Sequence, residues 1–281
     1  MRTLLPALAL AAAASLHAQT RPAPKDTTPI KHPGIEDNSF LVEEAFNQGE
    51  GVVQQVQTFQ RPTTGGSWGY SWTSEWPVPK QRHQLSSTVV LMRADGAGEP
   101  TRLGDGLINY RLQWIDDDAK GLLVAPRLTL VLPTGSAANG TGADAMGYQW
   151  MIPVTKQLRP KLITHWDVGH TITPGARNAA GRRATTHAWV LANSAIWQIT
   201  PVFNLMVEHI WSRGEQVTGA DRTSPFTQHW IAPGVRWAHD FRSGLQIVPG
   251  LAVPIGVGPT KGQRQLFLYW STEYDVRDVH R

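Results

Sequence analysis

The stretch from Lys120 to Gly135 alternates in polarity and constrains the fold more than any other part of the chain. From Leu122 to Leu132 every second residue is apolar, whereas the positions between them include Arg127 and Thr129. A two-residue period predicts a β-strand with two unlike faces. At about 3.3 Å per residue, a strand of this length crosses a bilayer at the tilt that barrel strands adopt. An arginine on the second face then requires a polar interior.

Further segments from Gly51 onward carry the same pattern. The ninth shows it clearly, with Leu205 and Val207 on one face and Glu208 on the other. Such segments, separated by turn residues, are the sequence signature of a membrane barrel. We therefore expect an all-β fold, a transmembrane antiparallel β-barrel of about 12 strands. The predicted strands lie near residues 51–60, 66–76, 83–93, 105–115, 121–132, 147–156, 161–172, 186–197, 202–212, 228–238, 245–255 and 265–275.

The connectors between these segments alternate in length. Short connectors follow the second, fourth, sixth, eighth and tenth strands, and long Gly-rich connectors follow the third, fifth, seventh and ninth. Bacterial barrels have short periplasmic turns and longer outer loops, so this alternation predicts that both termini lie on the periplasmic side. Prolines inside the predicted strands are expected at bulges, because proline has no N–H for the ladder. These prolines are Pro126, Pro153, Pro233, Pro249 and Pro254.

The N-terminal residues predict export. Arg2, an apolar run from Leu4 to Leu16 and small residues up to Ala18 are typical of a cleavable signal peptide over residues 1–18. Residues 19–48 then form a Pro-rich periplasmic leader, and residues 49–281 form the barrel. Within the leader, Asn38 or Ser39 is expected to cap a short helix that ends at Phe46. Two roles stay open for that helix, a packed leader or a gate or plug. The candidate gate residues are Phe40, Glu43, Glu44 and Phe46.

The composition narrows the class of protein. The chain has no Cys, which excludes a lipoprotein, disulfides and thiolate metal sites. Beyond the signal peptide no apolar run approaches the length of a spanning helix, so a membrane form must be a barrel. The composition of 12 Trp, 26 Gly and only 17% charged residues suits a barrel whose strands carry aromatic girdles and are joined by glycine turns. A secreted soluble β-sandwich shares some of these traits. Lys and Arg are scattered, so no nucleic-acid partner is expected.

The faces opposite the apolar rows carry charged residues in which acids and bases are nearly matched. These charged residues allow two interpretations: they form a salt-bridge lattice that closes the lumen, or they line a pore that selects solutes. Twelve strands lie between the eight that side chains can fill and the sixteen that leave a channel, so barrel size does not decide. Trp230 is expected to face inward and contact a solute. The candidate residues of the solute path are Glu75, Asn109, Arg111, Arg127, His165, Asp167, Glu208, Trp230, Arg236 and Glu273.

The sequence predicts no enzyme, cofactor or metal site. Serine and histidine candidates for a barrel hydrolase exist in Ser86, Ser87, His83, His165 and His209, but none lies in a G-x-S-x-G elbow. The H-x-x-x-H spacing that places two histidine ligands on one helix face is missing. The glycines of GTGADAMG lie between two predicted strands and do not open a helix, as a nucleotide loop requires. A hydrolase is therefore the less favoured alternative.

Six short segments, in order over nearly the whole mature chain, carry a resemblance to a known family. They are DNSFLVEEAFNQGEGVVQ (Asp37–Gln54), GDGLINYRLQ (Gly104–Gln113), APRLTLVLPTG (Ala125–Gly135), PVFNLMVE (Pro201–Glu208), APGVRWA (Ala232–Ala238) and IVPGLAVPIGVG (Ile247–Gly258). The chain resembles the outer-membrane family labelled MetA pathway of phenol degradation. One departure is its C-terminus, which runs past Tyr274 to DVRDVHR, whereas outer-membrane barrels often end on an aromatic residue.

The resemblance implies an outer-membrane transporter associated with the catabolism of aromatic compounds, with no agreed active residues. Together with the strand pattern it predicts a Gram-negative outer-membrane channel for passive uptake or efflux of small aromatic or apolar solutes. The expected partners are outer-membrane lipid, a small-molecule solute and the barrel-assembly machinery. The oligomeric state is open. The alternative is a closed-lumen barrel with a structural or binding role.

Overall fold

The computed structural model describes residues 35, 39–96, 98–242 and 244–277. Residues 1–31 form one unit of the chain and residues 32–281 form the other. The predicted signal peptide and residues 19–34 of the predicted leader therefore lie outside the described residues. Among the residues that are described, no helix is long and apolar enough to cross a membrane.

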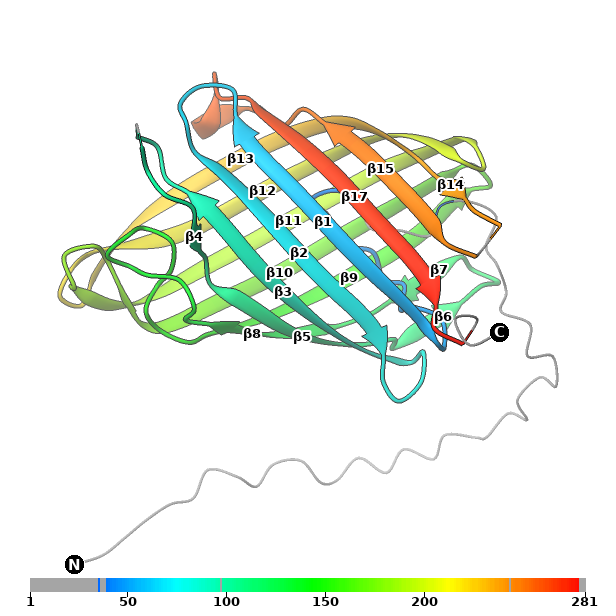
Figure 1. The fold of residues 1–281 in the computed structure, drawn as a ribbon, viewed down its shortest axis with the longest axis horizontal. Helices are drawn as coiled ribbons and strands as arrows, with labels where there is room; N and C mark the ends of the chain where they lie inside the picture. Colours follow the sequence, from blue (N-terminus) through cyan, green and yellow to red (C-terminus); the bar gives the residue numbers. More distant parts are fainter. Residues whose placement is uncertain (1–34, 36–38, 97, 243, 278–281) are drawn as a thin grey trace, which may run out of the picture. The chain divides into compact units, whose positions relative to one another are not determined.

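The chain from Val52 to Asp275 folds into one antiparallel β-sheet that closes on itself (Figure 1). β1 (Val52–Pro62) pairs with β2 (Trp68–Pro77) on one side and with β17 (Gln265–Asp275) on the other. Because Val52 lies opposite Asp275, the wall begins and finishes at the same end of the barrel. The prediction of a 12-stranded antiparallel barrel is confirmed.

Several short elements are pieces of one spanning strand. β4, β5 and β6 together make one strand, as do β7 with β8 and β15 with β16, while β14 is a short hairpin partner of β15. The remaining elements are β3 (His83–Arg93), β4 (Arg102–Leu103), β5 (Gly106–Leu112), β6 (Ile115–Asp117), β7 (Leu122–Val124), β8 (Arg127–Leu132), β9 (Gly147–Arg159), β10 (Leu162–Arg177), β11 (Arg183–Thr200), β12 (Phe203–Gly219), β13 (Arg222–Trp237), β14 (His239–Asp240), β15 (Gln246–Ala252), β16 (Ile255–Gly256) and the 3₁₀ turn η1 (Gly258–Thr260).

Outward apolar and inward polar side chains alternate along the strands, as the two-residue period predicts. On β8, Leu128 is 61% exposed and the next residue, Thr129, is 3% exposed. Tyr110 of β5 and Trp150 of β9 lie on either side of Leu128 in the register, and all three are exposed. This pattern suits a barrel with hydrocarbon outside and polar groups enclosed.

Four neighbouring strands are longer than predicted. β11 spans 18 residues, and β12 and β13 are joined by residues 220–221 alone. The expected long loops after the seventh and ninth strands are therefore mostly hairpin. The hydrophobic rhythm ends where a strand leaves the apolar layer, whereas backbone pairing continues beyond it, so polarity alone places the boundary too early.

The expected bulges occur at only some of the prolines. Pro126 separates β7 from β8, and Pro254 separates β15 from β16. Pro153, Pro233 and Pro249 instead lie inside continuous strands, so the expectation of bulges there is wrong. Two of their carbonyls stay bonded, because Ala125 N–H donates to Pro153 O at 3.1 Å and Val253 N–H to Pro233 O at 3.0 Å. Each interruption thus lies beside a proline of the adjacent strand.

The predicted helix ending at Phe46 does not form in the described residues. Residues 39–50, which we call the inner segment, have bends and irregular backbone, and residues 36–38 lie outside the described part. The N–H groups that a helix would bond internally are donated to side chains of the barrel wall. Tertiary partners therefore override the local capping signal.

Candidate functional site

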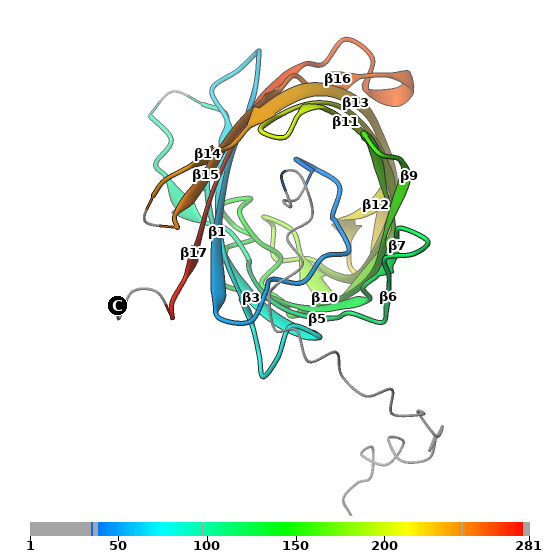
Figure 2. The same cartoon turned by 90° about the vertical axis from the view of Figure 1, so that its right-hand side faces the viewer.

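The inner segment lies within the ring of strands, where Figure 2 shows it as the blue stretch leading into β1. It begins at the wall, where the Ser39 and Ser194 hydroxyls lie 2.9 Å apart. The N–H groups of Leu41 and Val42 both donate to Glu208 Oε1 on β12, at 2.9 and 3.1 Å. These contacts fix one end of the segment to β11 and β12.

The segment then follows the wall across successive strands. Glu43 N–H donates to Asp167 Oδ2 on β10 at 2.8 Å, and Ala45 N–H donates to Thr155 Oγ1 on β9 at 2.9 Å. Farther along, Asn47 N–H bonds Gln113 Oε1 and Gln48 N–H bonds Gln84 Oε1 on β3. Buried N–H groups need partners, and here inward-facing wall side chains supply them.

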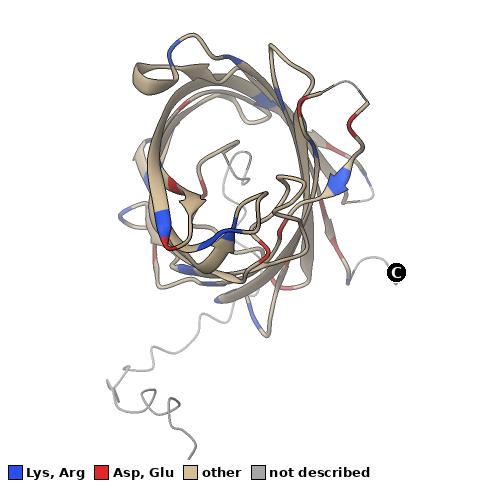
Figure 3. Ribbon diagram, turned by 90° about the vertical axis from the view of Figure 1, so that its left-hand side faces the viewer, with Lys and Arg blue, Asp and Glu red and all other residues tan. Residues whose placement is uncertain are grey.

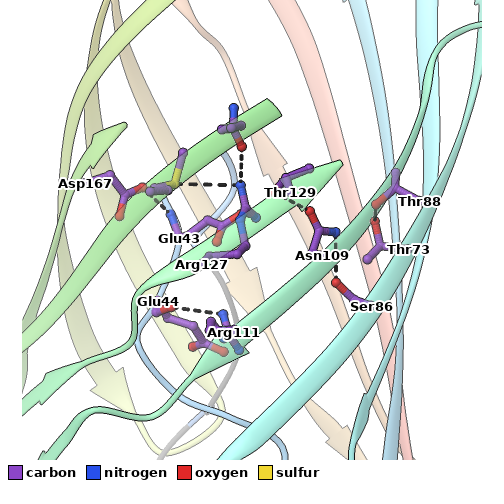
Figure 4. Close-up of polar contacts among 12 residues, drawn as sticks. Glu43, Glu44, Thr73, Ser86, Thr88, Asn109, Arg111, Arg127, Thr129 and Asp167 are labelled. Carbon is purple, nitrogen blue, oxygen red and sulfur yellow. Dashed lines mark hydrogen bonds and ion pairs between the residues drawn. The ribbon is translucent and has the colours of Figure 1, made fainter. Parts of the chain in front are cut away.

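The wall arginines also hold the segment. Arg111 Nε donates to Asn47 Oδ1 at 2.9 Å and its Nη1 donates to Glu44 O at 3.1 Å, while its Nη2 donates to Phe46 O. Arg127 forms an ion pair with Glu43, which Figure 4 shows beside Asp167. Arg236 donates to Ile35 O at 3.3 Å, so a wall arginine also binds a backbone carbonyl at the first described residue.

Phe40 is buried in an apolar socket formed by β13, β15 and β17. Its ring centroid lies 5.8 Å from that of Phe267 and 5.4 Å from that of Tyr269. A Cβ atom at Gly234 would lie 2.5 Å from the Phe40 ring, and one at Gly250 would lie 2.3 Å from it. Both glycines are therefore required for the ring to fit. We call this site the Phe40 socket.

A ladder of neutral polar side chains lines the wall beside Arg111 and Arg127. Asn109 donates to Ser86 Oγ at 3.0 Å and accepts from Thr129 Oγ1 at 2.7 Å, and Thr73 bonds Thr88 at 2.8 Å (Figure 4). These hydroxyls and amides satisfy one another across β2, β3, β5 and β8. This side of the barrel therefore carries no net charge from them.

The residues predicted for the solute path all face the interior. Arg127 and Glu273 are half-buried, and the other eight are buried, with Glu208 at 0% and Arg236 at 1% exposed. Among the candidate gate residues, Phe40 and Glu44 are buried, while Glu43 and Phe46 are half-buried. The structure brings Glu43, Arg127 and Asp167 together, and it brings Glu44 and Phe46 to Arg111. Trp230 lies apart from these contacts on β13, where the register places it opposite Ile210.

Sequence reasoning missed the neutral wall residues that hold the inner segment. Thr155, Gln113 and Gln84 each accept a backbone N–H from it. The strand pattern places their side chains inward, since residues two apart share a face, as Gln84 does with Ser86 and Gln113 with Arg111. The Phe40 socket left no such signal, because the role of Gly234 and Gly250 depends on a residue about 200 positions away.

Comparison with known proteins supports the architecture. No family model matches the chain, and no curated protein does. Among solved structures, the COG4313 outer membrane channel from Pseudomonas putida F1 superposes with a TM-score of 0.60 at 14% identity, over 82% of this chain and 98% of that one. The chain has the fold of an outer-membrane β-barrel. The NanC porin is also similar, with a TM-score of 0.53 at 7% identity over 78% of this chain and 98% of that one. At such identities the likeness concerns the fold, so membership of the phenol-degradation family stays a prediction.

Proposed function

We propose that the protein is an outer-membrane channel through which small aromatic or apolar solutes diffuse, and that the inner segment is its gate. The observation that carries the proposal is a segment bound inside a closed barrel by wall side chains from β12 round to β3. Two solved barrels of similar fold are described as a channel and a porin, which supports the same role.

The way the segment is bound suits a gate. None of its N–H bonds to Glu208, Asp167 or Thr155 closes a helical turn, so release of the segment does not require unwinding of a helix. Hydrogen bonds to neutral groups such as Thr155 contribute about 1 kcal/mol each, and those to charged groups about 1.5–3 kcal/mol. These separate side-chain contacts, together with one buried ring at Phe40, hold a closed state that can exchange with an open one.

The apolar residues of the inner wall near Trp230 support the proposal that the solute is aromatic or apolar. Ala192 of β11, Ile210 of β12 and Trp230 of β13 lie side by side in the register. Ala192 and Trp230 are buried, and Ile210 is half-buried. Asp167 is the next residue in the same row. A solute passing here meets an apolar strip beside the charged contacts of the inner segment. We propose no catalytic role for Ser86, His165 or the other serines and histidines.

Replacing Trp230 with alanine tests the solute class. Purified protein in liposomes is expected to pass phenylalanine, and Trp230→Ala is expected to slow phenylalanine entry about two- to tenfold, because an aromatic contact contributes about 0.5–1.5 kcal/mol. Entry of serine, which is also zwitterionic, stays unchanged. Liposome swelling measures both rates.

The matched control is Trp189→Ala, which removes an outward tryptophan that is 45% exposed. It is expected to leave both rates unchanged. Equal slowing of phenylalanine and serine by Trp230→Ala would show that Trp230 has no part in selecting aromatic solutes. Swelling in neither solute, by wild type or by Phe40→Ala, would rule out the channel.

A further inference from the structure

The charges enclosed by the barrel become unbalanced when the inner segment is in place. Among the predicted lumen residues, Glu75, Asp167, Glu208 and Glu273 are acids, and Arg111, Arg127 and Arg236 are arginines. The inner segment adds Glu43 and Glu44 beside them, and it contains no Lys or Arg. Its third glutamate, Glu50, is exposed and is not counted with the enclosed charges. The predicted lumen residues and these two glutamates together supply six carboxylates and three guanidinium groups.

The two signs of charge are also partnered differently. Arg111 donates hydrogen bonds to Asn47 Oδ1, Glu44 O and Phe46 O, and Arg127 forms an ion pair with Glu43. The segment therefore covers these guanidinium groups. Asp167 and Glu208 instead receive backbone N–H groups of the inner segment, which are neutral.

Two of these buried carboxylates keep an oxygen that no group in the described part of the chain satisfies. Asp167 is 7% exposed and Glu208 is 0% exposed. Among the described residues, Asp167 Oδ1 and Glu208 Oε2 have no hydrogen-bond partner, and neither has Glu43 Oε2. A buried anionic oxygen without a donor is costly, and a nearby cation lowers that cost. The excess of acid is thus concentrated where residues 41–43 meet β10 and β12.

We infer that the gate region prefers cations over anions, so that the permeant solutes include cationic or zwitterionic amines. This inference rests on the proposed channel function. Carboxylates enclosed by low-dielectric walls focus a negative potential along a pore, and rings of Asp and Glu give cation channels their selectivity. The end of the barrel seen in Figure 3 carries Lys, Arg, Asp and Glu interspersed, which places the discrimination at the inner segment rather than at that rim.

The reversal potential in a planar bilayer under a KCl gradient tests the inference, because it does not depend on how many channels are open. Wild type is expected to pass K⁺ at least about threefold better than Cl⁻. The double variant Glu43→Gln with Glu44→Gln is expected to lower that ratio at least about twofold. Asp167→Asn gives a second, independent test in the same direction.

The matched control is Glu99→Gln, which removes an exposed carboxylate from an outer loop and is expected to leave the ratio unchanged. A wild-type channel that conducts without preferring K⁺ would overturn this inference and leave the proposed function standing. So would a ratio that neither the double variant nor Asp167→Asn alters. Absence of conductance in both wild type and Phe40→Ala would overturn the proposed function together with the inference.

Discussion

Replacing Gly250 with valine is expected to raise the ion conductance of the protein about tenfold or more. The new Cβ would lie 2.3 Å from one atom of the Phe40 ring and 2.6 Å from another, so the ring must leave its socket beside Phe267 and Tyr269. Burial of a phenylalanine side chain contributes about 1.5–3 kcal/mol. Because each 1.4 kcal/mol is a factor of ten in an equilibrium constant, the gate shifts strongly toward its open state.

Gly69→Val is the matched control for this experiment. It places the same side chain on β2, where a Cβ atom meets nothing within 4 Å. Its conductance in planar bilayers is expected to equal that of wild type, whereas Phe40→Ala is expected to reproduce the effect of Gly250→Val. Equal conductance of Gly250→Val and Gly69→Val would show that the Phe40 socket does not control the gate.

Replacing Arg111 with methionine is expected to lower the free energy of unfolding by about 3–5 kcal/mol, the usual loss when a buried ion pair is broken. The Arg111 side chain is 4% exposed and lies 4.0 Å from Glu75. It also bonds Asn47, Glu44 and Phe46 of the inner segment. The variant therefore removes a cation from beside a buried acid and leaves three acceptors without this donor. Denaturant titration of the refolded protein in detergent measures the loss.

Arg102→Met is the control for Arg111→Met. The Arg102 side chain is 38% exposed and pairs with Glu99 at 4.0 Å, and surface pairs of this kind contribute less than about 1 kcal/mol. A loss for Arg111→Met no larger than that for Arg102→Met would mean that the interior contacts of Arg111 add nothing to stability.

The barrel was predictable because its pattern is local. Leu128 and Thr129 fall on opposite faces through strand geometry alone, and every predicted strand overlaps an observed one. The inward position of Asp167 and Glu208 followed from the same parity. What local patterns cannot give is the partner of each inward group. Their partners are N–H groups of the inner segment, 124 and 166 residues away.

The same reason explains the main error. The sequence around Ser39 carries a helix cap signal, but a wall that offers Glu208, Asp167 and Thr155 as acceptors holds the chain in bends and irregular backbone instead. This error lies at the proposed gate, where the conformation is decided by distant residues.

A disulfide between the inner segment and the wall tests the account most directly. The chain has no Cys, and the Ser39 and Ser194 hydroxyls lie 2.9 Å apart, so Ser39→Cys with Ser194→Cys places two sulfur atoms within bonding reach. Thr58→Cys with Ser71→Cys is the matched control, since its hydroxyls lie 2.7 Å apart on β1 and β2 and the bond leaves the segment free. Bilayer conductance is expected to fall when the first pair is oxidised, to recover on reduction, and to stay constant in the control. Conductance that oxidation of the Ser39–Ser194 pair leaves unchanged would contradict a gate formed by residues 39–50.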